Sequence, residues 1–173
     1  MIRLIAAIDR KRGIAKQGFQ PWFIPADGEY FGQQTKLYGA VILVGSTTFK
    51  TFSGPLTGRQ NYVLTRDKTP IDGVELVHDL ASFLKDYVTK DLWVIGGANV
   101  FAQIMELERA DELYLTQIEA DFGCNQFFPH FGDTYTLVEE SDLHEQNGFI
   151  FTYNRYVKQS SIVASPQPTA QSA

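Results

Sequence analysis

Short apolar runs separated by amphipathic stretches dominate the first two-thirds of the chain. Apolar runs of a few residues, bounded by turn-forming residues, are typical of buried strands. Where the apolar spacing becomes helical, capping residues mark the helix starts, such as Pro25 at a first helical position and Asp79 as an N-cap. The pattern therefore predicts strands over 2–8, 40–45, 61–65, 74–77 and 92–95, and helices over 25–36, 80–88 and 98–108.

After Asp111 the pattern contains strands only. Strands are predicted over 112–119, 135–140 and 149–157, and the Asn147-Gly148 pair has the chemistry of a tight hairpin turn. Strands that first alternate with helices and then follow one another directly are typical of an α/β fold. We expect a sheet that is mostly parallel and gains an antiparallel edge from the C-terminal strands.

The length and composition predict one domain followed by a polar tail. The chain has 173 residues, which suits a single domain over residues 1–158. Residues 159–173 carry no charge, and Ile162 and Val163 are their only large apolar residues. This segment buries too little apolar surface to offset the entropy lost on ordering, so we expect it to be disordered.

Charge and cysteine content narrow the partners and the compartment. The net charge of −5 argues against nucleic acid, and no apolar run is long enough for a membrane span. The apolar start precedes the charged residues 9–12, which is the reverse of a signal peptide. A single cysteine, Cys124, forms no internal disulfide, so we expect a cytoplasmic protein. The three histidines lack metal-ligand spacing, and we expect no metal site.

Asp27 is the first candidate for chemistry. It falls in the first turn of the helix predicted from Pro25, where the helix dipole favours a carboxylate. Tyr30 and Phe31 follow at i+3 and i+4, so the acid shares a helix face with aromatic rings. Two interpretations stay open: an acid that only supports the helix start, or a carboxylate on an apolar wall that hydrogen-bonds a heterocycle.

Glycine and hydroxyl residues follow three predicted strands, where ligands bind in open α/β sheets. Gly96-Gly97 precedes a helix whose free N–H groups suit phosphate, although a tight turn explains the pair as well. The segment 45–48 ends another strand, and its Ser46 and Thr47 also suit helix caps. Thr65-Arg66 ends a third, and Arg66 alone suits a solvated surface position.

Two further polar residues have both a functional and a structural interpretation. Arg59 offers a planar fork suited to a carboxylate, but arginines in turns are commonly solvated. Thr116 shares a strand face with Tyr114 and Ile118, so its hydroxyl needs a buried partner. That partner is either a functional group or a nearby backbone group.

Taken together and in this order, these residues resemble the dihydrofolate reductase family. The resemblance covers residues 1 to about 158 and depends on the ordered set rather than on one motif. The set comprises Leu4-Ile5-Ala6-Ala7, Pro21-Trp22, Pro25-Ala26-Asp27, Phe31, Thr35, Gly45, Pro55-Leu56, Gly58-Arg59, Asn61, Ile95-Gly96-Gly97, Leu113-Tyr114-Leu115-Thr116 and Phe128-Pro129.

The resemblance implies an eight-stranded sheet flanked by four helices, with dihydrofolate and NADPH meeting in a cleft. It implies a monomer that transfers a hydride from nicotinamide C4 to pterin C6, with a proton reaching N5. Asp27 would bond the pterin 2-amino group and N3, Thr116 would be a second contact, and Trp22 would hold an ordered water. The implied substrate-binding residues are Ile5, Ala6, Gly28, Phe31, Phe52, Leu56 and Arg59, the last for the α-carboxylate of the glutamate tail.

The resemblance also implies where the cofactor binds. Residues 9–24 would form a mobile loop over the nicotinamide, and the Gly96–Gly97 bond would be cis. The implied cofactor-binding residues are Ala7, Ile14, Gly45, Ser46, Thr47, Thr48, Thr65, Arg66, Ile95, Gly96, Gly97, Ala98, Asn99, Val100 and Phe101.

The sequence departs from the usual family pattern at four places. Gly28 replaces a bulky aliphatic residue beside the substrate, and Ala15 replaces a glycine in the loop. Ser46 stands where several bacterial relatives have an arginine near the cofactor phosphates, and Asn125 where an aspartate often tethers the loop.

Two other functions remain as alternatives. The reductase of riboflavin synthesis shares the fold and the glycine pair, but the segment 22–27 and Arg59 favour folate. A catalytically silent folate- or dinucleotide-binding protein is the other, against which the presence of Asp27, Thr116 and the glycine pair argues.

Overall fold

The structure is a computed structural model that describes residues 1–160. Of the predicted tail, residues 161–173 lie outside the described part of the chain. Gln159 still belongs to the folded domain, because its backbone N–H donates to the Thr134 carbonyl at 2.9 Å and its side chain donates to Thr136 Oγ1 at 2.9 Å.

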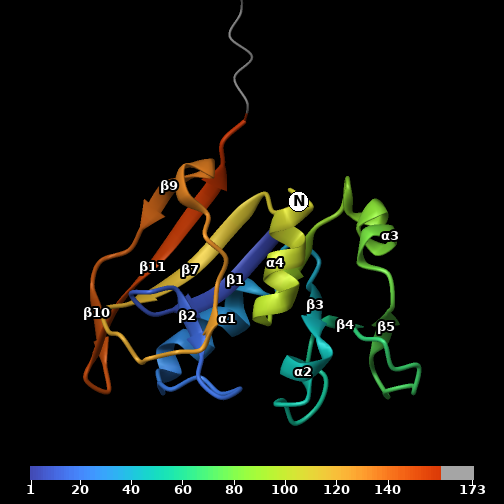
Figure 1. Cartoon of the computed structure of the whole chain (residues 1–173), viewed down its shortest axis with the longest axis horizontal. Helices are drawn as coiled ribbons and strands as arrows, with labels where there is room; N and C mark the ends of the chain where they lie inside the picture. The colour runs from blue at the N-terminus through green and yellow to red at the C-terminus, as the bar shows by residue number, and fades with distance from the viewer. Residues whose placement is uncertain (161–173) are drawn as a thin grey trace, which may run out of the picture.

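A twisted central sheet organises the described chain (Figure 1). Its strands follow the order β10-β11-β7-β1-β6-β3-β4-β5, and β9 also pairs with β11, so β9 and β10 share the outer edge of β11. All pairs from β7 to β5 are parallel, whereas β11 is antiparallel to its three neighbours. The predicted α/β fold with an antiparallel C-terminal edge is confirmed. The strands are β1 (Ile2–Ile8), β3 (Val41–Gly45), β4 (Gln60–Leu64), β5 (Glu75–Val77), β6 (Leu92–Val94), β7 (Glu112–Ile118), β9 (Tyr135–Glu140), β10 (His144–Gln146) and β11 (Phe149–Lys158).

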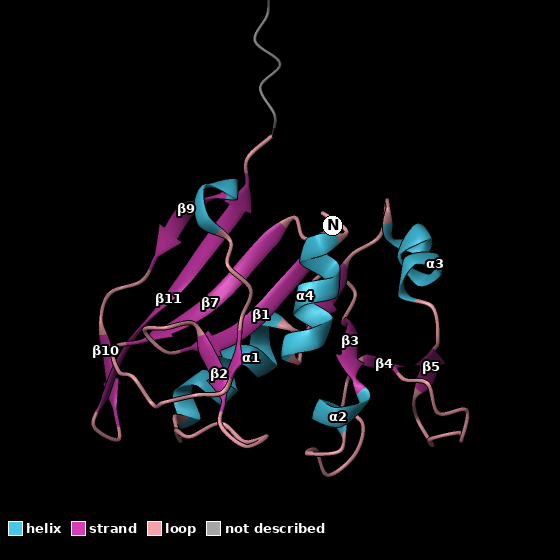
Figure 2. Ribbon diagram, viewed as in Figure 1, coloured by secondary structure: helices cyan, strands magenta, loops and turns pink. Residues whose placement is uncertain are grey.

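Four α-helices accompany the sheet, as the family resemblance implied (Figure 2). They are α1 (Pro25–Gln34), α2 (Ser46–Phe49), α3 (Leu80–Leu84) and α4 (Ala98–Glu106). The predicted cap is confirmed for α3, because the Asp79 side chain accepts a hydrogen bond from Ser82 N at 2.9 Å. The cap interpretation of Ser46 and Thr47 is wrong: Gly45 occupies the N-cap of α2, and Ser46 is already helical. None of the helices among residues 1–160 is long and apolar enough to cross a membrane.

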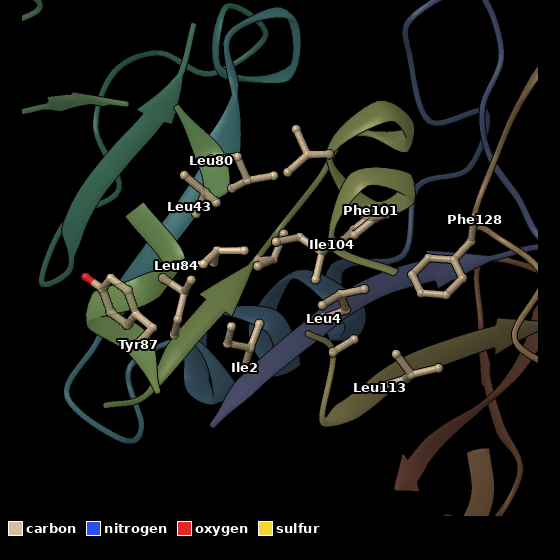
Figure 3. Close-up of a cluster of buried hydrophobic side chains, with 14 of the residues drawn as sticks. Ile2, Leu4, Leu43, Leu80, Leu84, Tyr87, Phe101, Ile104, Leu113 and Phe128 are labelled. Carbon is tan, nitrogen blue, oxygen red and sulfur yellow. The ribbon is translucent and has the colours of Figure 1, made fainter. Parts of the chain in front are cut away.

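Alternation along the buried strands divides the core between the two faces of the sheet. On β1, Leu4 packs with the side chains of α3 and α4, and Figure 3 shows it near Ile104 and Phe101. Its neighbour Ile5 points to the opposite face, where Trp93 and the partly buried aromatics of α1 pack. Because side chains alternate with a period of two, Thr116 lies on the same face of β7 as Tyr114, which faces α1.

The elements that the sequence pattern did not predict are all short. A second sheet pairs β2 (Gly13–Ala15) with β8 (Gln126–Phe127), and α2 and β10 were also missed. The hairpin at Asn147-Gly148 is confirmed, because Gln146 of β10 pairs with Phe149 of β11 and both turn residues have positive φ.

Candidate active site

A cleft of about 1080 Å³ opens at the carboxyl ends of β1, β3, β4 and β6. Ligands bind at such strand ends in open α/β sheets. The cleft brings together almost every predicted site residue, although they come from segments far apart in the sequence. The predicted residues that line it are Ile5, Ala6, Ala7, Ile14, Trp22, Asp27, Gly28, Phe31, Gly45, Ser46, Thr47, Thr48, Phe52, Leu56, Thr65, Arg66, Ile95, Gly96, Gly97, Ala98, Asn99, Val100 and Phe101.

Asp27 and Thr116 form a hydrogen-bonded pair at one end of this cleft. Thr116 Oγ1 donates to Asp27 Oδ1 at 2.6 Å, and Thr116 is only 2% exposed. Asp27 reaches it because Pro25 is the first residue of α1, which places the acid in the first turn above the sheet face of Thr116. The hydroxyl that needed a buried partner has therefore found a carboxylate rather than a backbone group. Asp27 Oδ2 makes no hydrogen bond among the described residues, and Asp27 lines the cleft.

The surroundings of Asp27 favour its protonated form. Burial raises the pKa of Asp27 above its usual value, because a charged carboxylate loses hydration there, and the Thr116 hydrogen bond opposes part of that rise. A carboxyl group with a raised pKa in a cleft is a candidate for acid–base work. The aromatic neighbours predicted at i+3 and i+4 contribute to this environment: Tyr30 stacks on Tyr153 with 4.1 Å between ring centroids, and Phe31 lines the cleft.

Trp22 carries a buried donor without a protein partner. The residue is 8% exposed, and its ring packs 5.1 Å from the Phe122 ring, centroid to centroid. Its Nε1 makes no hydrogen bond within residues 1–160. An unsatisfied buried N–H costs free energy, so its place at the cleft wall points to a water or ligand acceptor.

Arg59 and Thr116 are the predicted site residues that do not themselves line the cleft. Arg59 is half-buried, and its guanidinium donates through Nη1 to Thr35 Oγ1 at 2.7 Å. Thr35 Oγ1 in turn donates to the Phe31 carbonyl at 2.8 Å. Burial lowers the pKa of Arg59, although an arginine keeps its charge at neutral pH. Arg59 thus sits beside the end of α1, one turn beyond the cleft residue Phe31.

The glycine segments allow close contact between the backbone of β3 and the start of α4. Gly45 N donates to the Gly96 carbonyl at 2.8 Å, and the Gly96–Gly97 peptide bond is cis, as the resemblance implied. A Cβ on Gly97 would lie 2.6 Å from Thr48 Oγ1, so no larger residue fits there without a shift. The first residues of the nine-residue helix α4 line the cleft, and the free N–H groups of a helix start are suited to hold a phosphate.

The far end of the cleft contains Thr65 and Arg66 together with two residues that the sequence analysis did not single out, Asp67 and His78. Thr65 Oγ1 accepts from Asp67 N at 3.0 Å, which leaves the hydroxyl proton free to donate. His78 Nδ1 lies 2.8 Å from the Thr65 carbonyl. Only the parallel register of β4 and β5, which continues one step past Leu64↔Val77, brings Thr65 and His78 together.

Residues 119–127 form hydrogen bonds with the loop that is predicted to cover the nicotinamide. Asn125 Oδ1 accepts from Gln17 N at 3.0 Å, and Asn125 N donates to the Ala15 carbonyl at 3.1 Å. An asparagine therefore makes the loop contact at this position. Asp9, only 3% exposed, accepts from Gly13 N at 2.7 Å and from Phe122 N at 3.2 Å, a role that its place in a charged run did not suggest.

Other lining residues were missed because no local sequence pattern marks them: they are apolar residues, amides, one glycine and one threonine. They are Ala15, Gly18, Phe19, Gln20, Phe23, Ile24, Pro25, Thr51, Leu64, Leu80, Gln103 and Gln126. Within the described chain no group of three or more His, Cys, Asp or Glu side chains is arranged to hold a metal ion.

The chain is similar in sequence to a family of known enzymes. A family model described as dihydrofolate reductase matches residues 1–158. The chain is 31% identical over 160 residues to the dihydrofolate reductase of Haemophilus influenzae, covering 86% of this chain and 96% of the relative. It is 32% identical over 167 residues to that of Bacillus subtilis, covering 93% and 96%. It is 35% identical over 133 residues to the type 3 dihydrofolate reductase of Salmonella typhimurium, covering 76% and 80%. The chain belongs to the dihydrofolate reductase family and is an oxidoreductase.

Proposed function

We propose that this enzyme reduces 7,8-dihydrofolate to 5,6,7,8-tetrahydrofolate with NADPH. The observation that carries the proposal is the hydrogen bond of 2.6 Å from Thr116 to Asp27, since Asp27 lines a cleft that the Gly96-Gly97 turn also lines. One end thus offers a carboxylate to a heterocycle, and the other offers backbone N–H groups and a cation to a dinucleotide.

Asp27 is the proposed partner of the pterin ring. Its Oδ1 is held by Thr116, which fixes the orientation of the carboxyl group, while Oδ2 is available to accept from the 2-amino group and N3. No other acidic side chain lines this end of the cleft, since Asp67 lies at the far end beyond β4. Ile5, Phe31, Phe52 and Leu56 supply the apolar walls that would hold the pterin and benzoyl rings. The half-buried Arg59 fork would bind the glutamate α-carboxylate.

The chain offers fitting groups for NADPH. The small residues at Gly45, Gly96 and Gly97 permit close approach of the backbone, and the first turn of α4 provides N–H groups for the pyrophosphate. Thr65 and Arg66 provide a hydroxyl donor and a cation for the 2′-phosphate. When bound, the nicotinamide would supply the hydride that reaches pterin C6.

Two residues, Asp27 and Trp22, would assist the transfer of a proton to N5. Because burial raises the pKa of Asp27, this carboxyl group takes up a proton more readily than a solvated one, and it would influence protonation of the pterin without contact to N5 itself. The unpartnered Nε1 of Trp22 is suited to hold a water between the carboxyl group and the ring. The loop residues Phe19 and Phe23, which line the cleft, would exclude bulk water.

A spectrophotometric assay of NADPH oxidation tests the proposal. We expect oxidation that depends on dihydrofolate, and none with the pyrimidine substrate of the riboflavin-pathway reductase. Oxidation with that pyrimidine alone would support the first alternative. Binding of folate and NADPH without turnover would support the second. The proposed monomer and cytoplasmic location are open to size-exclusion chromatography and cell fractionation.

A further inference from the structure

Two basic side chains, Arg66 and His78, line the cleft in the described part of the chain, and no others do. Both lie at the same end, past the carboxyl ends of β4 and β5. The whole chain carries a net charge of −5, so its general field does not attract an anionic cofactor. Ser46, which also lines the cleft, brings no charge. Recognition of a phosphate at this end therefore depends on these two side chains and on nearby hydroxyl and N–H donors.

The backbone fixes the place of the His78 ring. Thr65 N donates to the Val77 carbonyl at 2.9 Å, which continues the β4–β5 ladder by one step. The next partner of Thr65 is the His78 side chain, since Nδ1 lies 2.8 Å from the Thr65 carbonyl oxygen. His78 is otherwise exposed and lines the cleft.

This contact also fixes the tautomer of the ring. A carbonyl oxygen only accepts, so Nδ1 must carry hydrogen in both charge states of His78. The variable proton is then on Nε2. With that proton the ring is a cation with a second donor; without it, Nε2 presents a lone pair that disfavours a phosphate oxygen.

Few charged groups lie near His78, and its acidic neighbours already accept hydrogen bonds. Asp67 Oδ1 accepts from Thr69 N at 2.8 Å and from Thr69 Oγ1 at 2.7 Å, and Lys50 acts on the same carboxylate. Asp79, the residue after His78, accepts from Ser82 N as the cap of α3. Arg66 is exposed beside them. The groups that face His78 are thus two carboxylates, both already hydrogen-bonded, and the Arg66 cation.

We propose that His78 is a second cationic partner of the cofactor's 2′-phosphate, alongside Arg66, and that it makes the preference for NADPH over NADH depend on pH. This inference rests on the proposed function and names a specificity residue for the same cleft. Protonation at Nε2 adds a donor and a charge that only the phosphorylated cofactor uses. The preference therefore rises as the pH falls through the range in which His78 gains its proton.

The test is a binding measurement that needs no turnover. Dissociation constants of NADP⁺ and NAD⁺ are measured from pH 6 to 8.5 by quenching of protein fluorescence, for the wild type and for His78→Asn. The asparagine amide takes the place of Nδ1 and keeps a donor for the Thr65 carbonyl, but it has no counterpart of Nε2 and no charge. Loss of a proton from the phosphate itself affects both proteins equally and cancels in the comparison.

We expect the NADP⁺ preference of the wild type to exceed that of His78→Asn by about two- to fivefold at pH 6, the scale of an exposed ion pair, and to equal it at pH 8.5. Equal pH dependence in the two proteins would overturn the role of His78 and leave the NADPH assignment standing. A variant that loses affinity for both nucleotides alike would also overturn it, since His78 would then act on the fold of the site. Absence of any NADP⁺ preference in the wild type at every pH would overturn the cofactor assignment as well.

Discussion

The two ends of the cleft place their ionisable side chains in opposite environments, one partly buried and the other exposed. Asp27 is a half-buried carboxyl group whose pKa is raised by burial and whose oxygen is held by a hydroxyl 2.6 Å away. Arg66 and His78 at the other end are exposed, and His78 has one backbone contact. The difference suits two tasks: a partly desolvated group influences protonation of a substrate, whereas solvated cations recognise an anion without altering it.

This comparison also orders the expected effects of substitutions. Interactions of a desolvated charge are strong, and loss of one partner is costly. Interactions between exposed charges are weak and are screened by salt. Substitutions at the Asp27 end should therefore change turnover and pH dependence, and those at the Arg66 end should change affinity by smaller, salt-dependent factors.

The largest effect is expected for Asp27→Asn. The variant keeps the shape of the side chain but lacks the ionisable group, so kcat with dihydrofolate at pH 7 should fall by about 10²- to 10⁴-fold, the usual contribution of acid–base catalysis. Glu29→Gln is the matched control, because Glu29 is an exposed acid on the same helix, and it should leave kcat unchanged. Near wild-type turnover of Asp27→Asn at pH 7 would contradict the proposed role.

The melting temperature of Asp27→Asn tests whether burial of the Asp27 carboxylate destabilises the folded protein. Because the pKa of Asp27 is raised in the folded state, ionisation there is less favourable than in the unfolded chain. Wild-type stability is therefore lost as pH rises from the ordinary carboxyl range through the raised pKa. Without ligands, Asp27→Asn should melt higher than wild type at pH 7, and the difference should vanish in acid, where Asp27 is neutral in both states. Each 1 kcal/mol corresponds to about 2–4 °C in a chain of this size. If Asp27→Asn melts lower than wild type at pH 7, the folded protein stabilises the ionised carboxylate of Asp27.

The next largest effect is expected for Arg59→Ala. Loss of a charge-assisted bidentate contact, worth about 1.5–3 kcal/mol, should weaken dihydrofolate binding by about 10- to 100-fold. NADPH affinity should hardly change, because Arg59 contacts the end of α1 just before β4, whereas Arg66 lies past the opposite end of that strand. Arg59→Lys keeps the charge without the planar fork and should give an intermediate loss. Titration of both ligands checks this, and equal losses for the two would place Arg59 outside the substrate site.

A smaller effect is expected for Arg66→Ala, which removes an exposed cation at the opposite end. The NADPH-to-NADH ratio of kcat/KM should narrow by about three- to tenfold at low salt and less at high salt. Arg66→Lys retains the charge and should preserve most of the preference. A ratio that is unchanged in Arg66→Ala, or insensitive to salt in the wild type, would show that the phosphate is recognised elsewhere.

The sequence predicted those helices and strands that are long enough for the spacing of their apolar residues to repeat. β1 and β9 have the predicted bounds, and the long strands and helices differ from prediction by a few residues at their ends. The elements it missed, such as β8 with two residues and α2 with four, are too short to show a period. Their formation depends on tertiary contacts, for example the pairing of Gly13 with Phe127.

The site residues divide in the same way, into those that a local sequence pattern marks and those that only the fold brings together. Asp27 and the glycine pair could be named as candidates from their local patterns, although each pattern also had a structural interpretation. Only the fold shows that Thr116 and Asp27 touch. His78 has no local signature, and its place in the cleft follows from the parallel register of β4 and β5. The burial of Asp9 likewise depends on residues 122–124, more than a hundred positions away.

The smallest expected effect concerns Gly28, which lies at the Asp27 end but has no charge. It is the fourth residue of α1, where glycine costs up to about 1 kcal/mol relative to alanine. It lines the cleft, and a Cβ built there meets no atom within 4 Å. Neighbouring side chains have therefore not filled this space, and a larger residue can enter without a clash at its first carbon.

Gly28→Leu should raise the melting temperature slightly and tighten dihydrofolate and methotrexate binding by about two- to fivefold. Full burial of a leucine side chain would contribute about 1.5–3 kcal/mol, but the open cleft allows only part of that burial. NADPH affinity without folate should not change, because Gly28 lies on the substrate side. Gly32→Leu is the matched control: its Cβ also meets nothing within 4 Å, but Gly32 does not line the cleft, so it should gain helix stability without tighter ligand binding. Titrations of the three proteins with methotrexate and with NADPH decide the outcome. Weaker methotrexate binding by Gly28→Leu would mean that the rest of the side chain clashes with the ligand, and equal tightening by Gly32→Leu would mean that helix stability alone is responsible.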